Sequence, residues 1–272
     1  MPKAHPPRPA AKSQPRVRRG YFECRYGQLH VHNAIPSGGG FEEATPLLCL
    51  HGSPHSGRVF ARFLAIAGVG RSVFAPDLPG FGDSDPPPPR AGVAEHAAAI
   101  GDFLDTMRLR QIDLLGHRFG ALVAAELAAA RPTQVRRLVL VSPPAQDAAE
   151  PSPTPSAIDG NHLLEEWRRA LAYCGSNAPP ETATAAMAER LRNSAQAAVA
   201  AAAERGYALR TRLAQLSAPL LVLRLQDEVV ANRGQAHDIP ARARVVELPE
   251  RGASVFETAP EAAAQALESF LR

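Results

Sequence analysis

Cysteine, tryptophan and long apolar runs are scarce in this chain of 272 residues, which has three cysteines and one tryptophan. Cys24, Cys49 and Cys174 are odd in number and far apart, so they predict neither a disulfide framework nor a cysteine metal site. A reducing compartment suits them, and we expect a cytoplasmic protein. No stretch approaches the ~18 apolar residues that span a bilayer, so we expect no membrane partner.

Acidic residues are absent from residues 1–20, which carry six basic ones: Lys3, Arg8, Lys12, Arg16, Arg18 and Arg19. These six exceed the net charge of +3, so the remaining 252 residues are acidic by about three charges. Nucleic-acid binding by the folded part is therefore not expected. The segment is rich in proline, and no apolar run follows its basic residues. We predict a disordered basic tail over residues 1–20, not a secretory signal, with a nucleic-acid-binding arm as the alternative.

Apolar strand-like runs alternate with helical patterns through the rest of the chain. The expected strands are Leu47–Leu50, Ser72–Ala75, Ile112–Leu115, Leu138–Ser142, Leu220–Leu225 and Val245–Leu248, preceded by a hairpin of Tyr21–Tyr26 and Leu29–Asn33 around Gly27. The expected helices are Ser56–Ala67, Val93–Met107, Phe119–Ala130 and Pro260–Leu271. Continuous apolar runs joined by helices predict an α/β fold with a mostly parallel central sheet flanked by helices.

One interval lacks any strand pattern. From residue 145 to 217 the chain is first rich in proline and then helical, over His162–Cys174 and Glu181–Arg205. We interpret residues 145–217 as a helical lid, or cap, inserted into a core of residues 21–144 and 218–272. A helical decoration without ligand contact is the alternative.

Three motifs follow three of the expected strands. His51-Gly52-Ser53-Pro54 comes after the first parallel strand, where glycine allows a close backbone approach. The loop Pro76–Asp85 follows the second and is punctuated by proline and glycine. Gly116-His117-Arg118-Phe119-Gly120 connects Ile112–Leu115 directly to a helix, which is the setting of a nucleophile elbow.

With these motifs in this order and spacing, the chain resembles the α/β-hydrolase superfamily over roughly residues 21–272, least clearly in the lid. The resemblance implies a serine-hydrolase-like site: a nucleophile at the elbow, an acid after a late strand and a histidine near the C-terminus. The elbow position is Arg118, and a guanidinium has no lone pair with which to attack. The acid corresponds to Asp227, with Glu228 a close second. In Leu248-Pro249-Glu250-Arg251-Gly252-Ala253, Ala253 occupies the histidine position. The triad is therefore predicted to be degenerate, and the protein a pseudoenzyme.

Other candidate groups do not restore a nucleophile and base. His117 and His51 belong to the family's motifs, where a structural role is expected. His55 could face the pocket, although a surface or capping role is favoured. Ser53, Ser84 and Ser142 lie near strand ends, Cys49 reads as a buried small hydrophobe, and His237 comes too early for the family histidine.

Loss of the nucleophile leaves the pocket in place. In the family the oxyanion-hole donors are main-chain amides, which correspond here to Ser53 and Phe119. Arg118 adds a cation beside them, so the site could recognise a carboxylate, phosphate or enolate. Alternatively, Arg118 extends into the volume vacated at Ala253, pairs with Asp227 or Glu228, and plugs the pocket.

Three functions remain open. The first is a non-hydrolytic pseudo-hydrolase that binds a small ligand, and an anion is one candidate for that ligand. The second is an enzyme of non-hydrolytic chemistry, such as a lyase, isomerase or cyclase, in which Asp227, Glu228 or His55 moves protons. Weak ester hydrolysis through water ranks last. We expect no cofactor and no metal, and the sequence leaves a protein partner or homodimer undetermined.

Overall fold

The computed structural model describes residues 14–36, 43–144, 158–175, 178–225, 239–248 and 252–272. Their centre is an eight-stranded sheet in the order β1-β2-β4-β3-β5-β6-β7-β8. Its strands are β1 Arg18–Cys24, β2 Gly27–Ala34, β3 Leu47–Leu50, β4 Val73–Pro76, β5 Ile112–His117, β6 Val135–Val141, β7 Leu220–Leu225 and β8 Arg244–Leu248. Strands β3 to β8 run parallel to one another, while β2 pairs antiparallel with both of its neighbours, β1 and β4. The predicted mostly parallel sheet is therefore confirmed.

The N-terminal hairpin begins earlier than the sequence pattern predicted. Strand β1 starts at Arg18, which pairs with Asn33 across the hairpin, so residues 18–20 belong to the sheet. Val17 packs against the core on one face of the sheet. The boundary of the expected tail at residue 20 is thus wrong, because backbone pairing with β2 orders residues whose side chains are polar or absent. Residues 1–13 lie outside the described residues.

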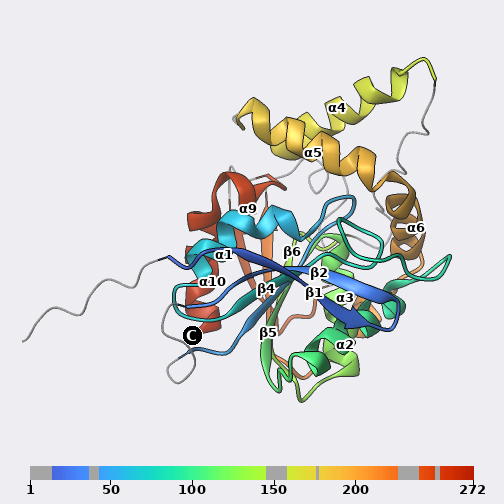
Figure 1. The fold of residues 1–272 in the computed structure, drawn as a ribbon. Helices are drawn as coiled ribbons and strands as arrows, with labels where there is room; N and C mark the ends of the chain where they lie inside the picture. The colour runs from blue at the N-terminus through green and yellow to red at the C-terminus, as the bar shows by residue number, and fades with distance from the viewer. Residues whose placement is uncertain (1–13, 37–42, 145–157, 176–177, 226–238, 249–251) are drawn as a thin grey trace, which may run out of the picture.

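Helices cover both faces of the sheet (Figure 1). They are η1 Gly57–Phe60, α1 Ala61–Ala67, α2 Val93–Thr106, α3 Phe119–Ala130, α4 Asn161–Cys174, α5 Pro180–Arg192, α6 Ser194–Arg205, α7 Leu209–Ala214, α9 Val255–Thr258 and α10 Pro260–Leu271. Successive strand residues point to opposite faces. Leu48 and Leu50 accordingly pack with α2 and α3, whereas Leu47 and Cys49 pack with α1 and α10. The central strands β3, β4 and β5 are therefore buried on both sides, which explains their continuous apolar runs.

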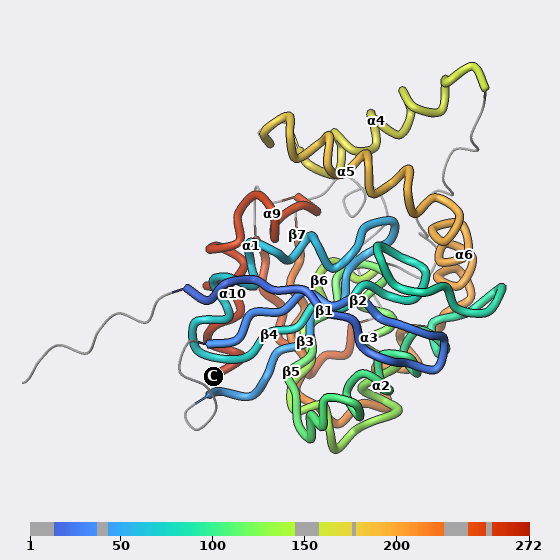
Figure 2. The backbone as a smooth tube through the Cα atoms, in the orientation of Figure 1, coloured from blue at the N-terminus to red at the C-terminus, as the bar shows by residue number. Residues whose placement is uncertain are grey.

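The described residues between β6 and β7 form the four helices α4 to α7, joined by short turns and coil. Helices α4 and α5 extend away from the sheet, and α6 returns the chain to it (Figures 1 and 2). The expected single helix Glu181–Arg205 is interrupted at Asn193. The side chain of Asn193 donates to the Pro54 carbonyl at 2.8 Å and accepts from the Gly82 amide at 3.1 Å. This break fixes the helical segment to the loops that follow β3 and β4.

The environment of Cys49 agrees with the expectation of a buried small hydrophobe. All three cysteines are free, and Cys49 is fully buried among apolar residues, where burial raises the pKa of its thiol. In the described parts of the chain, every helix is too short or too polar to cross a lipid bilayer.

Candidate functional site

Arg118 lies at a sharp turn between β5 and α3. Its backbone has φ 52° and ψ −118°, a conformation that side-chain-bearing residues rarely adopt. The turn is held by hydrogen bonds from the Arg118 amide to the Val141 carbonyl (3.0 Å) and from the Ala121 amide to the Arg118 carbonyl (2.8 Å). A Cβ at Gly120 would collide with the Leu50 carbonyl, so the crossing requires glycine there. The predicted elbow shape is confirmed, although its residue is arginine.

The loop after β3 lies directly against the elbow. Strand pairing aligns Leu50 with Gly116, and a Cβ built on Gly52 would lie 3.0 Å from the Arg118 Cβ. Ser53 and Phe119, which flank this contact, are both buried. Within the described part of the chain, neither of their amides donates a hydrogen bond to a protein acceptor. The two amides expected to form an oxyanion hole therefore remain available for a ligand.

His51 has the structural role that the sequence predicted. Its Nε2 accepts from the Leu78 amide at 2.8 Å, and its Nδ1 lies 3.1 Å from the Gly52 carbonyl. This pairing requires a proton on Nδ1 and a lone pair on Nε2, so the ring is neutral. Burial lowers the pKa of His51 in agreement. The ring thus joins the loop after β3 to the loop after β4.

The side chain of Arg118 is nearly buried and begins against the loop after β3. Arg118 is only 9% exposed, and its δ carbon also lies close to Gly52. After desolvation and Arg190, the charge of Arg118 contributes to lowering the pKa of His55. Arg118 also acts to lower the pKa of Tyr173, although burial raises that pKa overall. A positive charge is therefore placed near the rings of His55 and Tyr173.

Tyr173, at the end of α4, covers the position where the resemblance places a histidine. Its ring stacks on His55 with centroids 4.1 Å apart, and its hydroxyl donates to Glu257 Oε2 at 2.9 Å. Ala253 is buried in the same apolar cluster as Tyr173. A bond of 3.0 Å from the Ser254 hydroxyl to the Cys174 carbonyl holds the end of α4 against α9. The helical segment thus contacts Ala253 directly.

Glu257 is a partly buried carboxyl group beside this phenol. It lies in the short helix α9, and Ala253 belongs to the turn that precedes this helix. Desolvation raises the pKa of Glu257 to about 7, against a lowering contribution from the Tyr173 hydrogen bond. The group therefore changes charge near neutral pH and can take up or release a proton there.

Glu257→Gln is expected to change how stability depends on pH. The unfolded carboxyl has a pKa of 4.5 and the folded one about 7, so the folded state binds more protons between these values. The wild-type protein should therefore lose up to about 3 kcal/mol of unfolding free energy as pH rises from 4.5 to 7. Glutamine stays neutral, so the variant should lack this loss. Urea unfolding of both proteins across this pH range measures the difference, and parallel curves would contradict the assignment.

Two buried imidazole nitrogens at the site are without partners among the described residues, Nε2 of His55 and Nε2 of His117. Burial lowers the pKa of both histidines well below its usual value, so both rings are neutral. A buried polar atom without a hydrogen bond is costly. The site near Arg118 thus contains buried imidazole nitrogens that lack a partner among the described residues.

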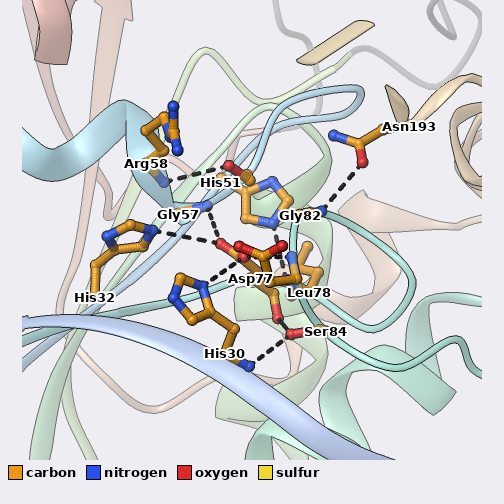
Figure 3. A network of polar contacts seen from close by, with 12 residues as sticks. His30, His32, His51, Gly57, Arg58, Asp77, Leu78, Gly82, Ser84 and Asn193 are labelled. Atoms are coloured by element: carbon orange, nitrogen blue, oxygen red, sulfur yellow. Dashed lines mark hydrogen bonds and ion pairs between the residues drawn. The ribbon is translucent and has the colours of Figure 1, made fainter. Parts of the chain in front are cut away.

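A second polar network fixes the loops that surround the site (Figure 3). The Asp77 carboxylate accepts from the amides of Gly57 (2.7 Å) and Asp83 (2.9 Å) and bonds to His30 Nδ1 (2.8 Å). The Ser84 hydroxyl donates to the Asp77 carbonyl at 2.8 Å. Ser84 therefore has a structural role here, and the network holds η1 and the loop after β4 in place.

The predicted pocket residues Ser53, Phe119, Arg118 and His55 do lie around one elbow. The favoured surface or capping role of His55 is wrong, because the ring is 3% exposed and lies beneath Tyr173. Ser142 lies at the end of β6, where its hydroxyl accepts from the Leu225 amide. The predicted residues Asp227, Glu228 and His237 lie outside the described residues, so a pair between Arg118 and an acid at 227 or 228 stays a prediction.

Sequence reasoning missed Tyr173, Glu257 and Arg190. Arg190 is buried and pairs with Glu166 at 2.7 Å, in the helical segment beside the site. The only local signal for Glu257 is its spacing of four residues from Ala253. Tyr173 and Arg190 belong to helices whose pattern shows a buried face but not what that face contacts.

Residues 45–215 match the family model described as the alpha/beta hydrolase fold. Over 150 residues the chain is 36% identical to a 2-hydroxymuconate semialdehyde hydrolase of Pseudomonas sp. (strain CF600), covering 51% of this chain and 49% of that protein. The chain spans half or less of the length of the curated relatives it matches.

Solved structures resemble the chain along nearly its whole length. An enol-lactonase from Burkholderia xenovorans LB400 superposes with a TM-score of 0.76 at 17% identity, covering 93% of this chain and 99% of that one. The N-acyl homoserine lactonase AidH, complexed with N-butanoyl homoserine, gives 0.71 at 22% identity, covering 94% and 97%. At these identities the likeness concerns the fold.

Proposed function

The chain belongs to the alpha/beta hydrolase fold family, and we propose on this premise that it binds a small anionic molecule at Arg118 and does not perform serine hydrolysis. The observation that carries the proposal is a cation in the strained elbow position. Serine and cysteine attack through a lone pair after losing a proton, which a guanidinium does not do at accessible pH. With Ala253 at the histidine position, the base is missing as well.

The surroundings of Arg118 favour an anion as the ligand. The amides of Ser53 and Phe119 lie on either side of the elbow, and His55 Nε2 lacks a protein partner among the described residues. These groups sit in a water-poor site, where charge-assisted hydrogen bonds are strong. A carboxylate or an enolate could use both the amides and the guanidinium. We infer that helices α4 to α7 act as a lid over this ligand. Tyr173 is the lid residue that contacts the core, at His55 and Glu257.

Arg118→Gln is expected to weaken the binding of a short-chain carboxylate, butyrate, by at least about tenfold, because one charge-assisted hydrogen bond contributes about 1.5–3 kcal/mol. Titration calorimetry or ligand-observed NMR measures the dissociation constant. Arg168→Gln, which changes an exposed arginine of α4 (side chain 66% exposed), is the matched control and should bind as the wild type does. Equal binding by the wild type and Arg118→Gln, or no butyrate binding at all, would remove the anion site.

A second candidate function is non-hydrolytic catalysis. The observation that favours it is Glu257, whose pKa near 7 suits a general acid or base and whose oxygen contacts the Tyr173 hydroxyl. In this version Arg118 and the amides stabilise an enolate oxygen while the carboxyl group moves a proton. Isomerase and lyase reactions on small carbonyl compounds need these two features. Exchange of solvent deuterium into a bound 2-oxo acid, lost in Glu257→Gln, would distinguish this candidate from simple binding.

A further inference from the structure

Three potential metal ligands converge in the Asp77 network, on β2 and directly after β4. His30 and His32 are two residues apart on β2, so their rings leave the strand on the same face. Asp77 follows β4, the antiparallel neighbour of β2, and its amide donates to the His30 carbonyl at 2.8 Å. The donor atoms of His30, His32 and Asp77 all lie within 4.8 Å of one another (Figure 3).

His32 does not share in the hydrogen bonds that Asp77 makes in this network. His30 Nδ1 bonds to one oxygen of Asp77 at 2.8 Å, but His32 Nε2 lies 4.0 Å from the other oxygen, too far for a hydrogen bond. The His32 ring lies against the His30 ring, with centroids 4.7 Å apart, so its donor atom stays close to the other two donors.

Hydrogen bonds already fix the orientation of the Asp77 carboxylate, as they do for carboxylates that bind a metal. The amides of Gly57 and Asp83 each donate to one oxygen of Asp77, and a carboxylate accepts about four hydrogen bonds. The oxygen that faces His32 has one amide donor and keeps a lone pair. Such outer hydrogen bonds fix the orientation of metal-binding carboxylates.

The distances and the access suit a small ion. Zn²⁺ bonds of about 2.0–2.2 Å place tetrahedral donor atoms roughly 3.4 Å apart. His32 therefore has to approach Asp77 from 4.0 Å, and the 2.8 Å bond between His30 and Asp77 has to open as the ion displaces its proton. The His32 side chain keeps 8% of its surface exposed, which leaves a path to solvent. Arg58 and Arg19 place positive charge near His32, and this charge weakens cation binding. The affinity should therefore be lower than that of a closed structural zinc site.

We propose that His30, His32 and Asp77 form a binding site for a divalent transition-metal ion, with Zn²⁺ favoured and water completing its coordination. Two imidazoles and a carboxylate are a common donor set for zinc with an open position. The site is separate from Arg118 and does not depend on the proposed function. It also revises the expectation of no metal, which rested on cysteine spacing and did not consider two histidines joined by a strand.

Titration calorimetry of the full chain, stripped with a chelator and then titrated with ZnCl₂, tests the proposal. His32→Phe is the informative variant, because it keeps a ring in place and leaves the bond between His30 and Asp77 intact. The matched control is His162→Phe in α4. We expect one ion per chain in the wild type and the control, and binding at least about tenfold weaker in His32→Phe.

Two results would overturn the site. Equal zinc binding by His32→Phe and the wild type would place the ion elsewhere, and no binding by the wild type would leave a hydrogen-bond network only. Should His32→Phe fail to fold, the absorption spectrum of the wild type loaded with Co²⁺ identifies the donor atoms instead. Ligand-field bands without thiolate charge transfer agree with nitrogen and oxygen donors, whereas thiolate bands would assign the ion to a cysteine.

Discussion

A fluorophosphonate probe is expected to leave the wild-type protein unlabelled and to label a variant that carries Arg118→Ser with Ala253→His. The elbow backbone is already in the strained geometry of a nucleophile, at φ 52°, and two amides flank it without protein acceptors in the described part of the chain. Serine would then need only a base, and a positioned general base contributes about 10²–10⁴-fold in rate. Mass spectrometry of the labelled protein and hydrolysis of p-nitrophenyl acetate measure the outcome.

Tyr173 limits what this double variant can recover. Ala253 is buried in one cluster with Tyr173, so a new imidazole competes with the phenol for the same space. Adding Tyr173→Ala should therefore raise the labelling rate further. Arg118→Ser alone is the matched control and should label slowly or not at all, because it has no base. Rapid labelling of the wild type would contradict the proposed absence of serine hydrolysis.

Phe256→Ala is expected to cost about 3–5 kcal/mol of unfolding free energy, the usual loss for a fully buried phenylalanine. The Phe256 ring contacts Phe60 and Phe63 at centroid distances of 4.7 Å and 5.2 Å, and His117 at 5.6 Å. It thus joins α9 to α1 and to the residue before the elbow. Removing the ring leaves a cavity, because the surrounding helices are held in place and cannot move in to fill it. The melting temperature should therefore fall by roughly 10 °C.

Phe270→Ala is the matched control for this substitution. Phe270 is also a phenylalanine of the C-terminal segment, but it is only partly buried at the edge of the same core. Its loss should cost less than half as much. Urea unfolding measures both losses of unfolding free energy. Equal losses in Phe256→Ala and Phe270→Ala would show that the ring cluster around Phe256 does not stabilise the core beside the elbow.

The strained elbow without a hydroxyl or thiol is the main physical oddity of this protein. A residue with a side chain in this conformation costs of order 1–3 kcal/mol, and it persists only where the surroundings enforce it. Here the enforcement is visible in the close approach of Gly120 to Leu50 and in the bond from the Arg118 amide to Val141. The fold therefore maintains the elbow whatever side chain it carries, and Arg118 is presented where a nucleophile would be.

Prediction from sequence succeeded where local pattern decides structure. Continuous apolar runs such as Leu220–Leu225 set the parallel strands, and the glycines around Arg118 set the elbow. It placed helix α3 directly after the elbow and recognised the arginine from one position of one motif. Boundaries were less accurate, as at Arg18, because pairing with a neighbouring strand orders residues that have no apolar pattern of their own.

The sequence by itself thus determined the sheet, the elbow and the arginine at its tip. Only the tertiary structure decided what surrounds that arginine. Tyr173 and Glu257 are 84 residues apart, and their hydrogen bond depends on how α4 packs over α9. The raised pKa of Glu257 likewise arises from desolvation by that packing. Such contacts leave no periodic trace, because a helix pattern fixes which face is buried and not which partner covers it.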